Sequence, residues 1–423
     1  MAYKGSRYNN FLHLGDAVVV FNSYSGALVE PDDEFMKNYA LAASGGNADP
    51  AATEDMLAAG LIVEDDVDEL EALKSEYRHR TDSADSLNLI IAPTLACNFS
   101  CPYCYEKRDA GLMGERVMAD VVGLVEANTL RGRDVSVMWY GGEPALGKRV
   151  VENLTSRMRR VCARSGVGYK ASMVSNGYML DDPTWVMNMG IERVEITLDG
   201  MKETHDSRRR LAEGGGTFDH IVENVRRLLG EGVEVNLRVN ADKRTVDEAR
   251  SLVDYLLGCS VEGFDVHLGL VKDFTPSGLV RDGYLSMEEF AHQFVDFHRF
   301  LWSRGLRDCA MSMMPTPKVN ACTLDAPNSF VVDPVGRVYK CIAEIGDGDR
   351  SIASVSDTLS PEMGCDRVNP FSFSECVECK MLPVCMGGCL RAMDEGFAAR
   401  CEVWRYAWEE CIRTFLMMAR EAE

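Results

Sequence analysis

The chain has 423 residues, which gives room for about two to four domains of ordinary size. Asp and Glu outnumber Lys and Arg by 66 to 45, a formal net charge of −21 that disfavours binding to nucleic-acid phosphates. Apolar residues make up 46% and charged residues 26%, which excludes global disorder, and no apolar run reaches the roughly 18 residues of a membrane span. The first residues show no signal-peptide pattern, so we expect a soluble, cytoplasmic protein that binds neither nucleic acid nor membrane.

Residues 1–85 form the first predicted zone. Alternating apolar residues predict a strand at Ala17–Phe21, and a second short strand follows a turn at Ala27–Val29. Helical periodicity predicts helices at Glu34–Ala43, Ala52–Leu61 and Glu69–Arg80. A strand pair with short helices is the minimum of a winged-helix-like module.

Residues 86–270 alternate apolar runs with helical patterns. The predicted strands are Leu87–Ala92, Val135–Tyr140, Tyr169–Val174, Arg193–Leu198, Val233–Val239 and Phe264–Leu268. Near-continuous apolar strands separated by helices are typical of a parallel sheet covered by helices. Six repeats fall short of a closed eight-fold barrel, so we expect an α/β fold with a partial (β/α)6 barrel.

The remaining chain divides into a linker and a cysteine-rich region. Residues 271–310 carry one predicted helix, Ser286–Arg304, and residues 311–423 end in another, Val403–Ala422. The chain has 15 cysteines, an odd and high number that favours metal ligands over disulfides in a reducing compartment.

Three cysteines, Cys97, Cys101 and Cys104, follow the first predicted barrel strand with the spacing C-x3-C-x2-C. Three thiolates on one loop can hold three corners of an iron–sulfur cubane and leave the fourth iron open to a small molecule. The loop also lies at the carboxyl end of a strand, where parallel sheets bind ligands. A structural zinc loop is the alternative, but zinc takes four ligands and no His or fourth Cys lies within several residues.

The triad and four later motifs resemble the radical S-adenosylmethionine (SAM) superfamily. Gly141-Gly142-Glu143-Pro144 matches its glycine-rich loop for the methionine amino group, and Ser175-Asn176 lies where ribose contacts are expected. Asp199-Gly200, His205-Asp206 and Arg208 resemble the segment after the fourth strand, and Asn240 accompanies Arg238 on the fifth. By this resemblance the cofactor contacts are Tyr103, Gly141, Gly142, Glu143, Pro144, Ser175, Asn176 and Arg238.

The same resemblance implies the chemistry. SAM would chelate the open iron, and an electron from the reduced cluster would cleave its sulfonium C–S bond. The resulting 5′-deoxyadenosyl radical would abstract a hydrogen atom from a substrate. An electron donor such as flavodoxin or ferredoxin is implied, whereas the sequence identifies no general base.

A second cysteine array extends from Cys322 to Cys401 and resembles the SPASM domain, which carries two auxiliary 4Fe–4S clusters in radical enzymes that modify peptides and proteins. By resemblance, one auxiliary cluster is held by Cys376, Cys379, Cys385 and Cys401, and the other by Cys322, Cys341 and Cys389. The protein would then carry three 4Fe–4S clusters. From spacing alone, one or two zinc ribbons are an alternative.

Three points about this array stay open. A predicted β-hairpin, Phe330–Val332 with Arg337–Tyr339, would deliver Cys341 beside Cys322. Cys309 and Cys365 are candidates for the missing fourth ligand, and an iron left open for a substrate thiolate is the alternative. Cys411 competes with Cys401 as the last ligand.

Two branches of SPASM enzymes differ in features that this sequence displays. Anaerobic sulfatase maturases usually carry an Asp base after the cysteine equivalent to Cys341, where this chain has Ile342, and their triad lies close to the N-terminus. Residues 1–85 instead resemble the leader-recognition element of maturases of ribosomally made peptides, which often binds the leader as an added strand. The alternative is a merely structural cap.

We therefore expect an enzyme that forms a thioether in a precursor peptide. A C–C cross-link, an epimerisation or sulfatase-type formylglycine formation are alternatives within the family. A non-catalytic electron carrier is an alternative of another class.

Overall fold

The computed structural model describes residues 2–15, 17–79, 85–108, 111–271, 283–394 and 401–422. The chain forms two compact units: unit 1 comprises residues 1–82, 287–325 and 366–423, and unit 2 comprises residues 83–286 and 326–365. The sequence placed domain boundaries at residues 85, 270 and 310. The structure differs because residues 326–365 of the cysteine-rich region belong to unit 2, and the N- and C-terminal regions share unit 1.

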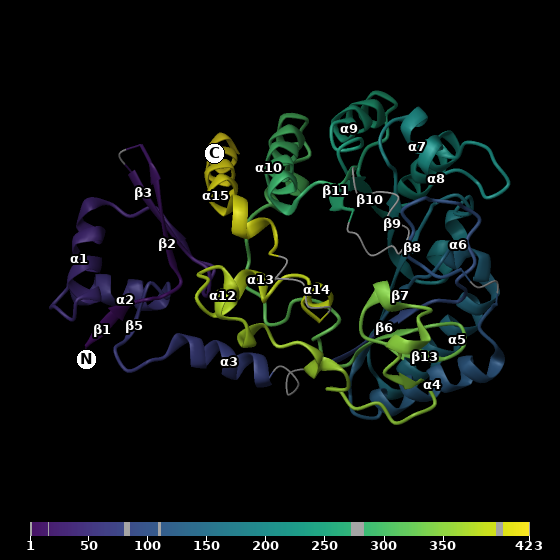
Figure 1. The fold of residues 1–423 in the computed structure, drawn as a ribbon, viewed down its shortest axis with the longest axis horizontal. Helices are drawn as coiled ribbons and strands as arrows, with labels where there is room; N and C mark the ends of the chain where they lie inside the picture. The colour runs from purple at the N-terminus through teal and green to yellow at the C-terminus, as the bar shows by residue number, and fades with distance from the viewer. Residues whose placement is uncertain are drawn as a thin grey trace. The chain divides into compact units, whose positions relative to one another are not determined.

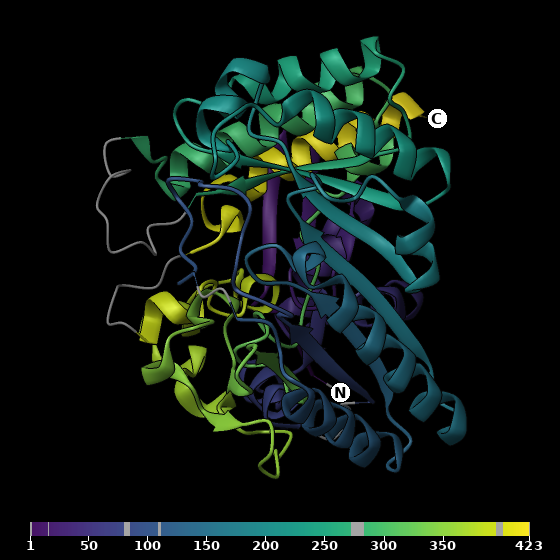
Figure 2. The same ribbon diagram turned by 90° about the vertical axis from the view of Figure 1, so that its right-hand side faces the viewer.

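Unit 2 is built on a nine-stranded sheet with the order β11-β10-β9-β8-β7-β6-β12-β13-β14. Figure 2 shows strands of this sheet with helices alongside them. Six of these strands pair in parallel and lie in chain order, which confirms the predicted α/β architecture. They are β6 (Ser86–Ile91), β7 (Asp134–Trp139), β8 (Tyr169–Ser175), β9 (Ile191–Thr197), β10 (Glu234–Ala241) and β11 (Asp265–Leu270).

Helices connect these strands. They are α4 (Glu115–Thr129), η1 (Pro144–Gly147), α5 (Lys148–Ser165), α6 (Pro183–Asn188), α7 (Lys202–Arg208), α8 (Phe218–Gly230) and α9 (Glu248–Gly258). Alternation along β10 shows how the sheet is covered: Val235, Leu237 and Val239 are buried, whereas the residues between them are only partly buried. The sequence analysis missed α7 because its seven residues, KETHDSR, carry no apolar period.

The predicted hairpin is present as β12 (Ser329–Val332) and β13 (Arg337–Tyr339), but it extends the barrel sheet rather than standing apart. β12 pairs in parallel with β6, and β14 (Ala353–Ser354) pairs with β13. Val331 and Tyr339 pack with Ile90 and Tyr140 in one apolar cluster. The strand order explains why this part of the cysteine-rich region folds with the barrel. Short 3-10 helices follow at Ile342–Glu344, Gly348–Arg350 and Cys365–Arg367.

The N-terminal part of unit 1 contains a small module of strands and helices. Its elements are β1 (Tyr3–Gly5), β2 (Asn9–Leu14), β3 (Ala17–Asn22), β4 (Leu28–Val29), α1 (Asp33–Ala43), α2 (Pro50–Ala58), β5 (Ile62–Glu64) and α3 (Glu69–His79). β1 pairs with β5, and β2-β3-β4 form an antiparallel sheet. The sequence did not predict β2, because Asn9 and Asn10 interrupt its apolar pattern. Both amides are buried with partners: Asn9 Nδ2 donates to the Leu61 carbonyl (2.7 Å) and Asn10 Nδ2 to the Tyr8 carbonyl (2.8 Å).

The rest of unit 1 is helical. Its elements are α10 (Met287–Ser303), α11 (Arg307–Met311), η6 (Pro370–Ser372), α12 (Ser374–Val377), α13 (Leu382–Cys385), α14 (Leu390–Asp394) and α15 (Val403–Ala422). α10 and α15 lie side by side (Figure 1), and Arg299 Nε donates to Thr414 Oγ1 at 3.1 Å. Phe21 of β3, Met381 and Ile412 belong to one core cluster, which explains why both ends of the chain form one unit.

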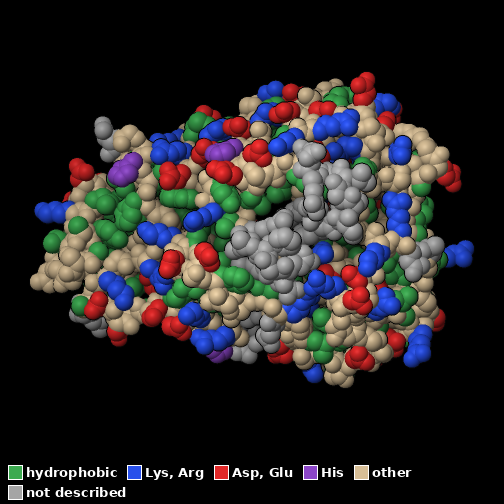
Figure 3. Space-filling model, viewed as in Figure 1, with side chains coloured by type: hydrophobic (Ala, Val, Ile, Leu, Met, Phe, Trp, Pro, Cys, Tyr) green, Lys and Arg blue, Asp and Glu red, His purple; other side chains and the backbone are tan. Residues whose placement is uncertain are grey.

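The described residues include no membrane-spanning helix, and charges of opposite sign are mixed on the face drawn in Figure 3. Within the described ranges, no helix combines the length and apolarity needed to cross a bilayer. On the face in Figure 3, Lys and Arg side chains are interspersed with Asp and Glu.

Candidate cofactor site and cysteine clusters

The cysteine loop, residues 97–104, follows β6 at the carboxyl end of the parallel strands of unit 2. Phe99 and Leu211 form an isolated antiparallel bridge. The Ser100 N–H donates to the Arg210 carbonyl (3.0 Å), and the Ala212 N–H donates to the Asn98 carbonyl (2.8 Å). The loop is therefore tied to the chain that follows α7.

Gly141 and Gly142, directly after β7, allow the entry to this loop to pack closely. A Cβ on Gly142 would lie 2.3 Å from the Ala96 carbonyl oxygen, and one on Gly141 would lie 2.4 Å from that of Thr94. Gly141 also has φ +108°, which side chains disfavour. The glycine pair therefore leaves space for the backbone of residues 94–96, which lead into the cysteine loop. The sequence did not reveal this packing role.

The Glu143 carboxylate joins the ends of two strands. It is fully buried, and its Oε1 accepts from the Ala145 N–H (3.0 Å) and from Ser175 Oγ (2.8 Å). Its Oε2 accepts from the Asn176 N–H (2.8 Å). Burial raises the pKa of Glu143, and these three hydrogen bonds oppose that shift. Both carboxylate oxygens are therefore engaged by the protein itself.

Two further predicted cofactor residues also support the loop. Ser175 and Asn176 are only 5% and 6% exposed. Asn176 Nδ2 donates to Asn98 Oδ1 at 2.7 Å and lies 3.9 Å from Cys97 Sγ. Pro144 opens the short helix η1, a position where its missing N–H leaves no bond unmade.

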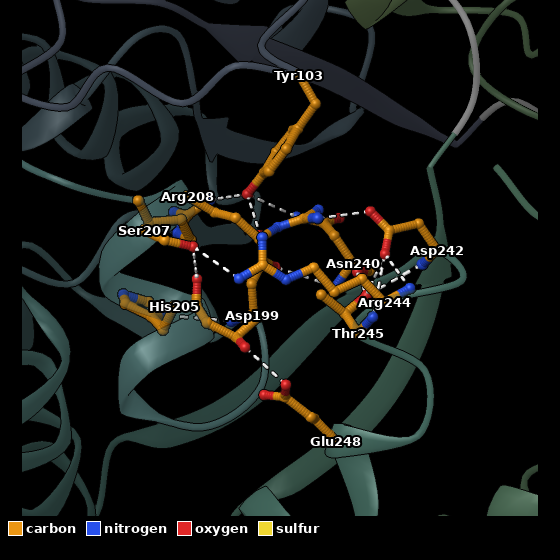
Figure 4. Close-up of polar contacts among 12 residues, drawn as sticks. Tyr103, Asp199, His205, Ser207, Arg208, Asn240, Asp242, Arg244, Thr245 and Glu248 are labelled. Atoms are coloured by element: carbon orange, nitrogen blue, oxygen red, sulfur yellow. Dashed lines mark hydrogen bonds and ion pairs between the residues drawn. The ribbon is translucent and has the colours of Figure 1, made fainter. Parts of the chain in front are cut away.

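Tyr103, between Cys101 and Cys104, is held by Asp199 and Asn240 near the ends of two strands (Figure 4) and by Arg209, which follows α7. Its hydroxyl donates a short hydrogen bond to Asp199, which follows β9. The same oxygen accepts from Arg209 Nη1 (2.8 Å) and from Asn240 Nδ2 (3.3 Å) on β10. The side chain inside the cysteine motif is therefore held by elements about 100 residues or more away in sequence.

Arg208 belongs to the same network. Its guanidinium carbon lies 4.9 Å from the centroid of the Tyr103 ring. Its Nε is 3.3 Å from Asp199 Oδ2, and its Nη1 is 2.5 Å from Asp242 Oδ2. Both carboxylates are almost completely buried, so Arg208 is a buried cation with two buried counter-ions.

His205 positions the turn that carries these arginines. Its Nδ1 lies 3.1 Å from the Asp199 N–H and must accept that hydrogen, so Nε2 carries the proton and donates to Thr217 Oγ1 at 3.0 Å. Burial lowers the pKa of His205 to about 3, which agrees with a neutral ring. Glu248 accepts from the Met201 N–H (2.9 Å) and from Thr204 Oγ1 (2.6 Å) in the same turn (Figure 4).

Arg238 is the predicted contact for the cofactor carboxylate. Its Nε donates to Asn240 Oδ1 (2.9 Å), and its Nη1 lies 3.8 Å from Glu195 Oε1 on β9. A Cβ on Gly269 would lie 2.5 Å from the guanidinium, so that glycine makes room for it. With 36% of its side chain exposed, Arg238 can reach an anionic group.

Sequence reasoning missed three side chains next to the motifs, of which Tyr140 is buried and Tyr105 and Glu106 are partly buried. The hydroxyls of Tyr105 and Tyr140 are hydrogen-bonded to each other. Burial raises the pKa of Glu106 to about 7, and its Oε2 has no hydrogen-bond partner among the described residues. Their positions were a usable signal, since Tyr105 and Glu106 follow Cys104 directly and Tyr140 precedes Gly141.

The chemistry of the triad fits an iron–sulfur cluster. Burial raises the pKa of Cys97 to about 12 and that of Cys104 to about 11, and it also raises the pKa of Cys101. Buried thiols of this kind lose their protons when a metal takes the proton's place. Soft thiolate donors on a tight loop suit iron–sulfur binding. Within the described part of the chain, no three His, Cys, Asp or Glu side chains lie close enough to hold a single metal ion.

Four cysteines of the second array gather in unit 1. Burial raises the pKa of Cys376 to about 11, and the nearby Cys401 and Cys379 add to the shift. Cys379 and Cys376 likewise add to the burial that raises the pKa of Cys385 to about 12. These four are the residues that the sequence assigned to one auxiliary cluster.

The other assigned ligands are divided between the units. Cys322 and Cys389 lie in unit 1, and Cys389 contributes to the raised pKa of Cys322, about 11. Cys341 follows β13 in unit 2. Cys365 is also in unit 2, where its thiol donates to the Ala326 carbonyl at 3.5 Å. Cys411 is buried in α15, and its charged neighbours are Glu410 and Arg299.

The part of the chain that contains the cysteine loop is similar to known proteins. Residues 91–256 match the radical SAM superfamily. The serine-type anaerobic sulfatase-maturating enzyme of Klebsiella aerogenes is 22% identical over 320 residues, which are 70% of this chain and 77% of that protein.

Two solved structures share the fold. The structure of anSMEcpe with bound AdoMet and Cp18Cys peptide covers 80% of this chain and 98% of its own, with a TM-score of 0.62 and 20% identity. That of Streptococcus suis SuiB bound to precursor peptide SuiA covers 95% of this chain and 99% of its own, with a TM-score of 0.51 and 15% identity. Residues 91–256 therefore form a radical SAM domain, and the chain is an iron–sulfur-dependent enzyme of radical SAM type.

Proposed function

We propose that this enzyme takes a hydrogen atom from a residue of a ribosomally made precursor peptide and closes a thioether between a peptide Cys sulfur and a carbon. The observation that carries the proposal is the folded module ahead of the cysteine loop. In its sheet, β4 pairs with β3 alone among the described strands, so its other edge is open to an extended peptide.

The surroundings of β4 suit a leader peptide. A hollow of about 300 Å³ lies beside the strand and is lined by Val29 and Phe35 together with acidic Glu30, Asp32 and Glu34. Main-chain pairing along the edge would supply affinity, and the hollow would take a side chain. Glu30 is ion-paired with Arg420, and Asp32 accepts from the Phe35 N–H, so Glu34 is the acidic side chain that favours a leader with a basic residue beside an apolar one.

The fold comparisons support a peptide substrate. The structural match to SuiB, solved with a precursor peptide, extends over 95% of this chain, whereas the match to anSMEcpe extends over 80%. The additional coverage is what an enzyme with a comparable module ahead of its cysteine loop would give.

Formylglycine formation, as in the sulfatase-maturating relatives, is the second candidate, and the identity to those enzymes favours it. The position after Cys341 argues against it. Ile342 stands there and packs against the apolar cluster of Val331 and Tyr339. An aliphatic side chain cannot accept the proton that an Asp at this position would take.

The residue roles follow from the donor chemistry. Cys97, Cys101 and Cys104 would hold the SAM-binding cluster, while Cys376, Cys379, Cys385 and Cys401 would hold one auxiliary cluster and Cys322, Cys341 and Cys389 the other. With SAM bound and an electron from flavodoxin or ferredoxin, the first cluster would supply a 5′-deoxyadenosyl radical. Arg238 would hold the cofactor carboxylate, and Tyr103 would line one side of the cofactor site.

Thioether formation balances without a further reagent. The peptide loses one hydrogen atom to the radical, one proton from its thiol, and one electron. An auxiliary cluster with an incomplete protein ligand set, as proposed for Cys322, Cys341 and Cys389, can bind the thiolate and accept that electron.

Co-expression with a Cys-containing precursor tests the proposal by mass spectrometry. We expect a product lighter by two hydrogens, with no free thiol at the bridged Cys, and no product from a precursor that lacks its leader. An unchanged thiol count with a new C–C link would reject the thioether. An aldehyde formed from Cys in a sulfatase peptide would favour the second candidate.

A further inference from the structure

We propose that Arg209 is the counter-cation of the cluster held by Cys97, Cys101 and Cys104 and that it raises the reduction potential of that cluster. The inference rests on the assignment of an iron–sulfur cluster to these cysteines. It adds a residue that none of the motifs above had assigned a role.

The backbone places Arg209 against the cysteine loop. The bridge between Phe99 and Leu211, and the hydrogen bond from the Ser100 N–H to the Arg210 carbonyl, align the residues after α7 with the loop. The Arg209 guanidinium carbon lies 5.7 Å from the centroid of the Phe99 ring. Its Nη1 donates to the Tyr103 hydroxyl at 2.8 Å. The cation is thus held between the aromatic residues that flank Cys101.

The burial of Arg209 calls for an anion. Arg209 is only 7% exposed, and its Nε has no hydrogen-bond partner among the described residues. Its neighbour Arg208 has Asp199 and Asp242 as counter-ions, but the hydrogen bond that Arg209 makes with its side chain is to a neutral phenol. Asp199 accepts from the same Tyr103 hydroxyl and so lies near Arg209, but it already pairs with Arg208. A thiolate-ligated cluster would supply further negative charge beside this buried cation.

The position of Arg209 is rigid. Its N–H donates to the His205 carbonyl at 2.7 Å, and its own carbonyl accepts from Thr217 Oγ1 at 2.6 Å. These bonds fix the backbone of Arg209, and the contacts with Tyr103 and Phe99 hold its guanidinium beside the loop.

The electrostatic consequence has a definite sign. One-electron reduction by an external donor makes the cluster and its three thiolates one charge more negative. A fixed cation in a buried, low-dielectric site stabilises that reduced form more than the oxidised form. Removing the cation should therefore move the midpoint potential to more negative values, and the cluster should become harder to reduce.

The test compares Arg209→Gln with Arg209→Lys, which keeps the charge, and with Arg210→Gln as a matched control. Arg210 is the next residue but is exposed, and its carbonyl rather than its side chain contacts the loop. After anaerobic reconstitution of the full chain, iron content is measured and the cluster is titrated by EPR without SAM. The signal that changes on later SAM addition identifies the right cluster.

We expect the midpoint of Arg209→Gln to be more negative than wild type at unchanged iron content. The shift should be smaller in Arg209→Lys and absent in Arg210→Gln. An Arg209→Gln protein with full iron and a wild-type midpoint overturns the proposal. Weakened SAM binding together with that unchanged midpoint would assign Arg209 to the cofactor instead.

Arg209→His keeps the proposal testable if the Gln variant does not fold, because its charge can be switched by pH. Its midpoint, relative to wild type at the same pH, should become more negative above the imidazole pKa. A difference that stays constant across that pH range overturns the proposal. Wild-type protein without any SAM-responsive cluster would overturn the cluster assignment itself, which is a distinguishable failure.

Discussion

The two cysteine regions of this protein are assembled in different ways. In unit 2, three thiols share one loop, and groups distant in sequence shape it: Gly142 packs on its entry, Asn176 contacts Asn98, and Leu211 bridges Phe99. In unit 1, Cys376, Cys379 and Cys385 lie on or beside the short helices α12 and α13, and Cys401 precedes α15. Burial raises the pKa of Cys376, Cys385 and Cys401, and Cys379 adds to each shift.

The difference shows what each region can do. Four converging thiols can satisfy a metal centre completely, as in closed structural sites. Three thiols leave one iron of a cluster free for an outside ligand. Such a loop depends on packing against the rest of the protein, because it lacks a fourth thiolate to hold the cluster. Four predictions, ordered by expected effect, test this distinction.

Cys101→Ala should have the largest effect, because it removes one of the three ligands proposed for the SAM-binding cluster. We expect 5′-deoxyadenosine formation from SAM to fall to background and iron to fall by about a third, one cluster of three. Chromatographic analysis of 5′-deoxyadenosine and iron quantification measure both. Cys162→Ala, in the buried part of α5, is the control and should retain iron and SAM cleavage. If Cys101→Ala still cleaved SAM, the role proposed for the three-thiol loop in unit 2 would be wrong.

Cys376→Ala should separate the two regions. We expect iron to fall by about a third while SAM cleavage persists, because the loop in unit 2 is intact. Cys411→Ala is the matched variant from the same unit: it should keep all iron and lose only about 1 kcal/mol of unfolding free energy from a small core cavity. Iron loss in Cys411→Ala, with none in Cys401→Ala, would reverse the assignment of the last ligand.

Gly142→Ala should destabilise unit 2 by about 2–3 kcal/mol, because its Cβ would meet the Ala96 and Leu95 carbonyl oxygens at 2.3 and 2.5 Å. Gly123→Ala is the control in α4, where a Cβ meets nothing within 4 Å. That change should stabilise by about 0.5–1 kcal/mol. Chemical denaturation of both variants measures the difference, and equal midpoints would show that the glycine pair is not a packing requirement.

The neutral His205 beneath the loop gives a smaller, pH-dependent effect. Its pKa is about 3 in the folded protein and about 6.5 when unfolded, so the unfolded state binds more protons below pH 6.5. Stability should therefore fall as the pH drops from about 6.5 towards 3, by up to about 1.4 kcal/mol per pH unit from this group.

Denaturation of cluster-free protein across that pH range measures the slope. His205→Asn keeps an acceptor for the Asp199 N–H but cannot be protonated, so its slope should be shallower than that of wild type. Parallel curves for the two proteins would show that His205 carries no such linkage.

The linear sequence determined the repeating elements and the ligand spacing. The six barrel strands, the hairpin at β12–β13 and the long helices α10 and α15 were all predicted, because apolar periodicity reports burial directly. The spacing of Cys97, Cys101 and Cys104, and the motif order along strand ends, led to the radical SAM domain that the superfamily match supports.

Only the tertiary structure decided how these parts support one another. It showed that Gly142 leaves space for the backbone of Leu95 and Ala96 and that Glu143 accepts hydrogen bonds from Ser175 and Asn176. It also showed that β12 pairs with β6. It also brought Arg209 to Phe99 and Tyr103, on either side of Cys101 in the loop. Such contacts join residues tens to hundreds of positions apart, and they depend on chain crossing and burial, which no local pattern encodes.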